Sequence, residues 1–214
     1  MPRSDPAPEA APVPRRYHHG DLRAALLEAA ETELAAQGVE RFSLRAVAKR
    51  AGVSHAAPAH HFGDANGLLT ALAVEGYHRF LATQRVHVAA APPGQPDRIV
   101  AAGQGYIAFA TSHPALFRLM FASDRPDRND PALQRAARSA YAHLLEQVAE
   151  LHGLADASAD PDARAHATAL WATVHGLAEL LQTGRARFLL ELPPAERDAV
   201  IAGILRRAAY PVKK

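Results

Sequence analysis

The chain has 214 residues, of which 49% are hydrophobic and 21% charged, so it can bury a core and is not a disordered tail. It contains no cysteine, which excludes disulfides, thiolate zinc sites and cysteine nucleophiles. The 24 Lys and Arg residues nearly balance the 22 Asp and Glu residues, so binding of nucleic acid would need a local basic patch. Aromatic residues are few and alanine is frequent, which favours an all-helical (all-α) fold.

The first sixteen residues, MPRSDPAPEAAPVPRR, carry prolines at positions 2, 6, 8, 12 and 14. Proline removes backbone donors that helices and sheets need, so residues 1–16 are expected to form a flexible arm ending in Arg15 and Arg16. No stretch approaches the roughly 18 apolar residues of a membrane span, and the signal-peptide order of charged and apolar residues is missing. We therefore expect a cytoplasmic protein without a membrane partner.

Three helices are expected early in the chain. The first covers Asp21 to Gln37, where apolar residues recur at helical spacing. The second begins after Ser43, a candidate N-cap, and ends at Gly52. The third follows a second candidate N-cap, Ser54, and ends at Gly63.

A longer fourth helix is expected after Asp64, and the proline-rich run at 91–96 ends it. We place a domain junction inside this helix, between residues 17–72 and 73–214. A further helix is expected to begin at Asp97. Four more are expected to begin at Pro114, Pro131, Pro161 and Pro194, because proline is favoured in a first turn. The total is about nine helices and no strand.

The second and third helices, joined through Gly52, match a helix-turn-helix unit. Residues 41–60 contain four cations and no acid, whereas residues 21–40 contain five acids and one arginine. The cations are Arg41, Arg45, Lys49 and Arg50. Helix N-termini and the Ser43 and Ser54 hydroxyls could bind phosphates, so this unit is a candidate DNA-binding surface. The alternative is a solvated charged stretch on an ordinary helix pair.

Residues 17–72, beginning YHHGDLRAALLEAA, resemble the DNA-binding region of the tetracycline-repressor (TetR) family. PALFRLMF at 114–121 and WATVHGL at 171–177 resemble the ligand-binding half of a subgroup with a Trp-His-Gly signature. The resemblance implies a homodimeric repressor that binds a palindromic DNA operator and is released by a small effector. The expected DNA-contacting residues are Arg15, Arg16, Ser43, Arg45, Ser54, His55, His60 and His61.

Two positions depart from that family's pattern. Ala59 stands where the third helix usually has a tyrosine, and Ala65 stands where the fourth helix usually has a lysine. Both usual residues contact DNA phosphates in the family, so their loss predicts weak binding or heavier use of Arg45, His55 and the arm. A regulator-like dimer that has lost strong operator binding is therefore the leading alternative.

The C-terminal half contains an apolar set of residues with a few polar groups. Trp171 and His175 lie four residues apart and share a helix face, so both could line one cavity. The candidate residues for binding a small, largely apolar effector are Tyr106, Phe109, Phe117, Met120, Phe121, Tyr141, Trp171 and His175. Ordinary core packing is the alternative for each of them.

Small residues recur in the last two long helices and would let helices of two subunits approach closely. They are Ala169, Ala172, Gly176 and Ala178 in one helix, and Ala199, Ala202, Gly203 and Ala208 in the other. A four-helix homodimer interface is expected, although packing within one chain would explain the same residues.

The 12 histidines do not predict a metal site. Adjacent residues on a helix point about 100° apart, so neither His18-His19 nor His60-His61 converges on one ion. No catalytic motif is present, so we expect no enzyme, no catalytic residues and no cofactor. A small helical enzyme that uses a histidine in the C-terminal cavity remains the alternative from another class.

Overall fold

The structure is a computed structural model that describes residues 19–92 and 97–210, so the predicted arm with Arg15 and Arg16 lies outside it. The described residues form ten α-helices and no strand. No helix among them is long and apolar enough to cross a membrane. The helices are α1 (His19–Gln37), α2 (Leu44–Ala51), α3 (Ala57–Phe62), α4 (Ala65–Ala90), α5 (Asp97–Ser112), α6 (Pro114–Ala122), α7 (Pro131–His152), α8 (Pro161–Gln182), α9 (Arg187–Leu190) and α10 (Pro194–Ala209).

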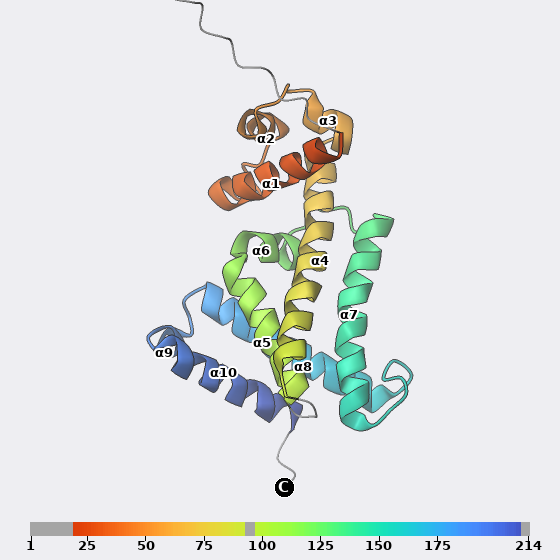
Figure 1. Cartoon of the computed structure of the whole chain (residues 1–214), viewed down its shortest axis with the longest axis vertical. Helices are drawn as coiled ribbons and strands as arrows, with labels where there is room; N and C mark the ends of the chain where they lie inside the picture. Colours follow the sequence, from red (N-terminus) through yellow and green to blue (C-terminus); the bar gives the residue numbers. More distant parts are fainter. Residues whose placement is uncertain (1–18, 93–96, 211–214) are drawn as a thin grey trace, which may run out of the picture.

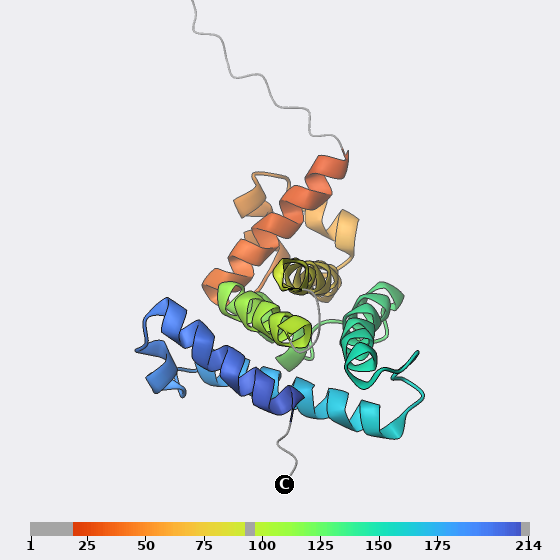
Figure 2. The same cartoon turned by 60° about the horizontal axis from the view of Figure 1, so that its bottom comes forward.

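Helices α1, α2 and α3 pack together at one end of the molecule, and α4 runs from them through the middle of the remaining helices (Figure 1). α5 and α7 pack against α4, and α6 crosses between α4 and α1. α8 and α10 lie side by side on the side farthest from α1, α2 and α3 (Figure 2). The all-helical fold expected from composition is confirmed.

Local capping explains where the early helices begin and end. The Ser43 hydroxyl accepts a hydrogen bond from the Ala46 amide at 3.3 Å, as expected of the N-cap of α2. Gly52 ends α2 with a φ of 68°, a left-handed conformation that glycine adopts without steric cost. The Asp64 carboxylate accepts from the Gly67 amide at 2.8 Å and caps α4.

The prediction that Ser54 is the N-cap of the third helix was wrong. α3 begins only at Ala57, and its N-cap is Ala56, which makes no side-chain capping bond. Pro58 explains the late start, because proline lacks an amide hydrogen and fits only in the first turn of a helix. Residues 54–56 form a turn instead, closed by a bond from the Ala57 amide to the Ser54 carbonyl.

The structure also adds one helix to the nine that were expected. α9 has only four residues, so it is too short to show a helical period in the sequence. Its one fully buried side chain, Leu189, anchors it between α8 and α10.

Close packing of α4 on α5 depends on Gly105. A Cβ at this position would lie 2.7 Å from the Gln84 Cα, which is backbone and cannot turn aside. Glycine therefore lets the two helix axes approach, and it holds α5 against the half of α4 that carries Tyr77, Phe80 and Gln84.

Replacing Gly105 by alanine is expected to lower the free energy of unfolding by about 1–3 kcal/mol, because the added methyl group would push α5 away from α4. Gln104→Ala, one residue earlier and half-buried, serves as the control and should change stability by less than about 0.5 kcal/mol. Denaturant unfolding followed by circular dichroism measures both. Equal stability of the two variants would contradict the close approach.

Candidate nucleic-acid interface and ligand cavity

The basic residues of the helix-turn-helix unit are not equivalent in the structure. Arg41, Arg45 and Lys49 are exposed, and none of them has an ion-pair partner among residues 19–92 and 97–210. Arg50 instead donates through Nη2 to Glu33 Oε2 at 2.9 Å, and Glu33 is 6% exposed. Arg50 therefore joins α2 to α1, which leaves three exposed cations for an anionic partner.

The candidate residues around α3 face different environments. His55 and His60 are exposed, whereas His61 is half-buried beside Phe62. The His60 and His61 rings stand 80° apart with centroids separated by 5.5 Å, so they do not converge on one ion. No group of three potential metal ligands occurs in the described part of the chain. On the other side of Phe62, the Arg23 guanidinium lies 5.3 Å from the ring centroid and ties α1 to α3.

The two positions that depart from the family pattern differ in accessibility. Ala59 is exposed on α3, and Ala65 is half-buried at the start of α4. Of the two serines proposed to bind phosphate, Ser43 already accepts one hydrogen bond as the α2 cap but keeps its own hydroxyl proton to donate. Ser54 is exposed in the turn before α3.

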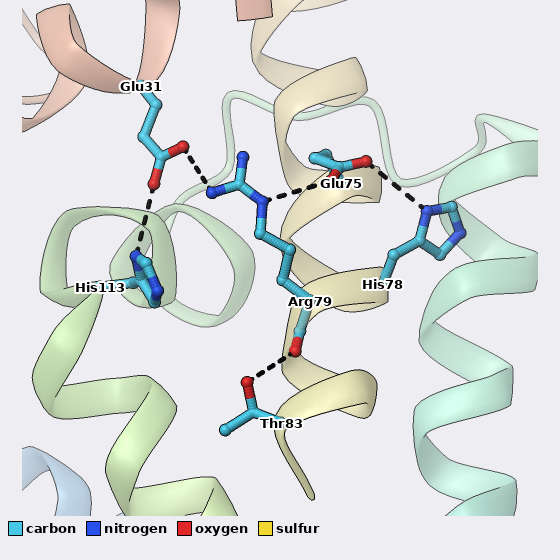
Figure 3. Close-up of polar contacts among 6 residues, drawn as sticks. All are labelled: Glu31, Glu75, His78, Arg79, Thr83 and His113. Carbon is cyan, nitrogen blue, oxygen red and sulfur yellow. Dashed lines mark hydrogen bonds and ion pairs between the residues drawn. The ribbon is translucent and has the colours of Figure 1, made fainter. Parts of the chain in front are cut away.

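A charged cluster joins the helix-turn-helix end of the molecule to α4 and to His113, which lies between α5 and α6 (Figure 3). Glu31 of α1 bonds Arg79 Nη1 at 2.7 Å and faces His113 Nδ1 at 3.5 Å. Arg79 also donates through Nε to Glu75 at 3.2 Å, and Glu75 in turn lies 3.9 Å from His78. These side chains are partly exposed, so each pair contributes little to stability and mainly sets how α1 sits on α4.

The loop between α6 and α7 makes a second connection to the N-terminal helices. Arg125 donates through Nε to Asn66 Oδ1 at 2.8 Å and through Nη1 to the Val39 carbonyl at 3.2 Å. The Asp127 amide donates to the Thr70 hydroxyl at 2.8 Å. The loop therefore binds both the turn after α1 and the first part of α4.

A cavity of about 330 Å³ lies between α4, α5, α7, α8 and α10. This volume falls at the lower end of the range typical of sites for small organic ligands. No Asp, Glu, Lys or Arg is among its lining residues in the described part of the chain. The wall consists of Tyr77, Phe80, Gln84, Ile99, Ala102, Gly103, Tyr106, Phe121, Ala137, Ala140, Tyr141, His143, Leu144, Gln147, Leu170, Trp171, Val174, Leu205 and Ala209.

Four of the eight candidate ligand residues lie in this wall: Tyr106, Phe121, Tyr141 and Trp171. The structure places the other four, Phe109, Phe117, Met120 and His175, outside it. Phe109, Phe117 and Met120 are fully buried, as the core-packing alternative expects. Trp171 and Tyr141 are 42% and 40% exposed and their ring centroids are 6.3 Å apart, so they mark where the cavity reaches the surface.

His175 acts on the cavity through another residue. The Tyr106 hydroxyl and His175 Nδ1 form a hydrogen bond at 2.8 Å. Burial raises the pKa of the Tyr106 phenol, which therefore stays protonated and able to donate. The Tyr106 ring also packs edge-on against Phe80 at 4.8 Å, so this hydrogen bond orients one side of the aromatic wall.

Sequence reasoning missed most of the wall. The polar residues that it overlooked are Gln84 on α4 and His143 and Gln147 on α7. All three are buried, although polar side chains of these types are usually exposed. The only signal in the sequence was their position on the apolar faces of two amphipathic helices, with His143 and Gln147 one turn apart.

Two known family patterns match this chain, one over the helix-turn-helix unit and one over the part that forms the cavity. The pattern of bacterial regulatory proteins of the tetR family matches residues 26–72, and that of the tetracyclin repressor-like C-terminal domain matches residues 99–207. No curated protein sequence matches the chain.

A solved structure of a protein with unknown function from Rhodococcus sp. RHA1 is 34% identical. The match covers 90% of this chain and 97% of that one, with a TM-score of 0.74. A TetR-like transcriptional regulator from the same organism is 18% identical and covers 92% of this chain and 100% of its own, with a TM-score of 0.64. At 18% identity, the likeness to this regulator supports the fold of the chain alone. The C-terminal pattern alone spans just over half of the sequence, and this chain belongs to the tetR family of bacterial regulatory proteins.

Proposed function

We propose that the protein is a ligand-responsive transcriptional repressor that acts in the cytoplasm and binds a palindromic operator as a homodimer. The observation that carries this proposal is the placement of two features at opposite ends of α4. Exposed Arg41, Arg45 and Lys49 lie at one end, and an uncharged cavity lies at the other. A small, largely apolar effector in the cavity would release the operator.

The contacts of α6 support a physical route between the two ends. Phe121 of α6 lines the cavity, and the loop that follows α6 binds the N-terminal helices through Arg125. An effector that moves Phe121 would shift this loop and with it the turn after α1. Glu31 and Arg79 provide a second contact that must adjust when α1 moves on α4.

The domain division and the α8 signature belong to the same proposal. We place residues 17–72 in the DNA-binding domain and 73–214 in the effector-binding and dimerisation domain, with the boundary inside the continuous α4. In the Trp-His-Gly pattern, Trp171 lines the cavity, His175 holds Tyr106, and Gly176 faces outward. One turn and a half of α8 would thus serve both the effector and the partner subunit.

The outer faces of α8 and α10 support the proposed dimer. Leu180 and Val200 are exposed large apolar residues on these helices, and small exposed residues such as Ala172 and Ala199 surround them. A Cβ at Gly176 would meet nothing within 4 Å, so none of the described residues packs against this position. A second copy that contributes the same two helices would cover it and form a four-helix interface.

The DNA surface can be tested by a salt titration on an operator that the purified protein selects from random DNA. Arg45→Ala should flatten the slope of log affinity against log salt by about 0.9 per subunit, because one phosphate contact is lost. Arg50→Ala is the matched control: it should leave the slope unchanged but lower stability, because buried Glu33 loses its partner. Equal slopes for Arg45→Ala and the wild type would contradict this placement of the DNA.

Joint substitution of Ala59→Tyr and Ala65→Lys should tighten operator binding, since it restores a phosphate-binding hydroxyl and a cation. The lysine should steepen the salt slope by about 0.9 per subunit, and the tyrosine should add roughly 1 kcal/mol as a neutral hydrogen bond. Failure to select any DNA by the wild type, with binding gained by the double variant, would instead favour a dimer that has lost operator recognition.

Gly176→Leu should weaken the dimer while the protomer stays folded, because a larger side chain has room in the protomer but not between two packed helices. Ala36→Leu on α1, an equally exposed position, should leave the dimer unchanged. Light scattering over a range of concentrations measures the mass, and circular dichroism reports folding. A wild type that remains monomeric at every concentration would refute the proposed homodimer.

A further inference from the structure

The walls of the cavity favour a flat aromatic ligand without charge. Six aromatic side chains line it: Tyr77, Phe80, Tyr106, Phe121, Tyr141 and Trp171. Aromatic rings attract one another in edge-on and offset arrangements, which a planar ring system can satisfy on several sides. Because no Asp, Glu, Lys or Arg lines the described cavity, an ionised ligand would lose its hydration without gaining a permanent partner charge.

One side of this wall carries a hydrogen-bond acceptor without a partner. His143 is 6% exposed, and its Nδ1 lies 3.5 Å from the Glu146 carboxylate at the surface. A carboxylate at this position favours the tautomer with the proton on Nδ1, which leaves Nε2 on the other side of the ring as an acceptor. Nε2 has no hydrogen-bond partner among the described residues.

The same imidazole stays neutral at physiological pH. Burial lowers the pKa of His143 and outweighs the Glu146 carboxylate, which acts in the opposite direction, while Arg85 and Arg98 lower the pKa further. A neutral ring with its proton on Nδ1 cannot pair with a ligand carboxylate through Nε2. It can only accept a hydrogen bond there.

Gln147 adds a second unsatisfied group one helical turn away. It is 5% exposed and lines the cavity, and its side-chain oxygen has no partner in the described part of the chain. Buried polar atoms are almost always hydrogen-bonded, because an unpaired one has lost its hydration without a replacement partner. Two unpaired acceptors on neighbouring turns of α7 indicate a ligand that brings a hydrogen-bond donor to this side of the cavity.

We infer that the effector is an uncharged aromatic alcohol, a molecule of the phenol class, whose hydroxyl donates to His143 Nε2 and contacts the Gln147 amide. A hydroxyl carries one proton, which satisfies the His143 Nε2 acceptor, while its oxygen can accept from the side-chain NH2 of Gln147. The inference rests on the proposed function, since it names the ligand class of the same cavity.

Three probes of nearly equal shape test the inference: 2-naphthol, naphthalene and 2-naphthoate. Each is added to the full-length protein at one concentration, and affinity is derived from the shift in melting temperature. We expect 2-naphthol to bind roughly tenfold tighter than naphthalene, because its hydroxyl adds one hydrogen bond. We expect 2-naphthoate to bind no better than naphthalene.

Variants of α7 test whether its side chains cause the preference for 2-naphthol over naphthalene. His143→Leu should reduce the ratio of 2-naphthol to naphthalene affinity to near one while naphthalene still binds, and Gln147→Leu should reduce it in part. His152→Leu lies on the same helix but outside the cavity, so it should keep the wild-type ratio.

The inference would be overturned if 2-naphthol and naphthalene bound equally or if 2-naphthoate bound most tightly. An unchanged affinity ratio in both α7 variants would also overturn it. None of these results would contradict the cavity as an effector site. Failure of all three probes to raise the melting temperature would count against both the inference and the cavity as an effector site.

Discussion

The whole arrangement depends on α4 as one unbroken helix. Its 26 residues span about 39 Å, from the Asp64 cap directly after α3 to the far side of the cavity. A hydrogen-bonded helix holds its backbone together over this length, so α4 connects the cavity wall at Phe80 to the helix-turn-helix end as one element. Gly105 adds to this constraint, because it lets α5 press against the α4 backbone where the cavity forms.

The contacts between the N-terminal helices and the rest of the molecule are suited to adjustment. Arg125 hydrogen-bonds Asn66 and the Val39 carbonyl, and the ion pair between Glu31 and Arg79 is partly exposed. Pairs of this kind contribute roughly 0–1 kcal/mol each, whereas coupling between two ligand sites typically amounts to 1–3 kcal/mol. In the proposed mechanism, rearranging a few such contacts would link effector and DNA binding without disrupting the apolar core.

The two histidines near the cavity have opposite roles, which follow from their hydrogen bonds. His175 Nδ1 is already hydrogen-bonded to the Tyr106 hydroxyl, so it stabilises the wall itself. His143 directs one ring nitrogen toward Glu146 and leaves the other unpaired. A satisfied polar group shapes a binding site, whereas an unsatisfied buried one favours whichever ligand completes it.

The sequence by itself determined the helical fold and most helix limits, because capping residues such as Ser43 and Asp64 and the prolines that open later helices act locally. It also located the basic helix-turn-helix unit. Only the tertiary structure showed that Arg50 is engaged by Glu33 and that His143 faces an apolar cavity. These facts depend on contacts between helices, and the helical period of one segment cannot show which side chain of another segment lies opposite.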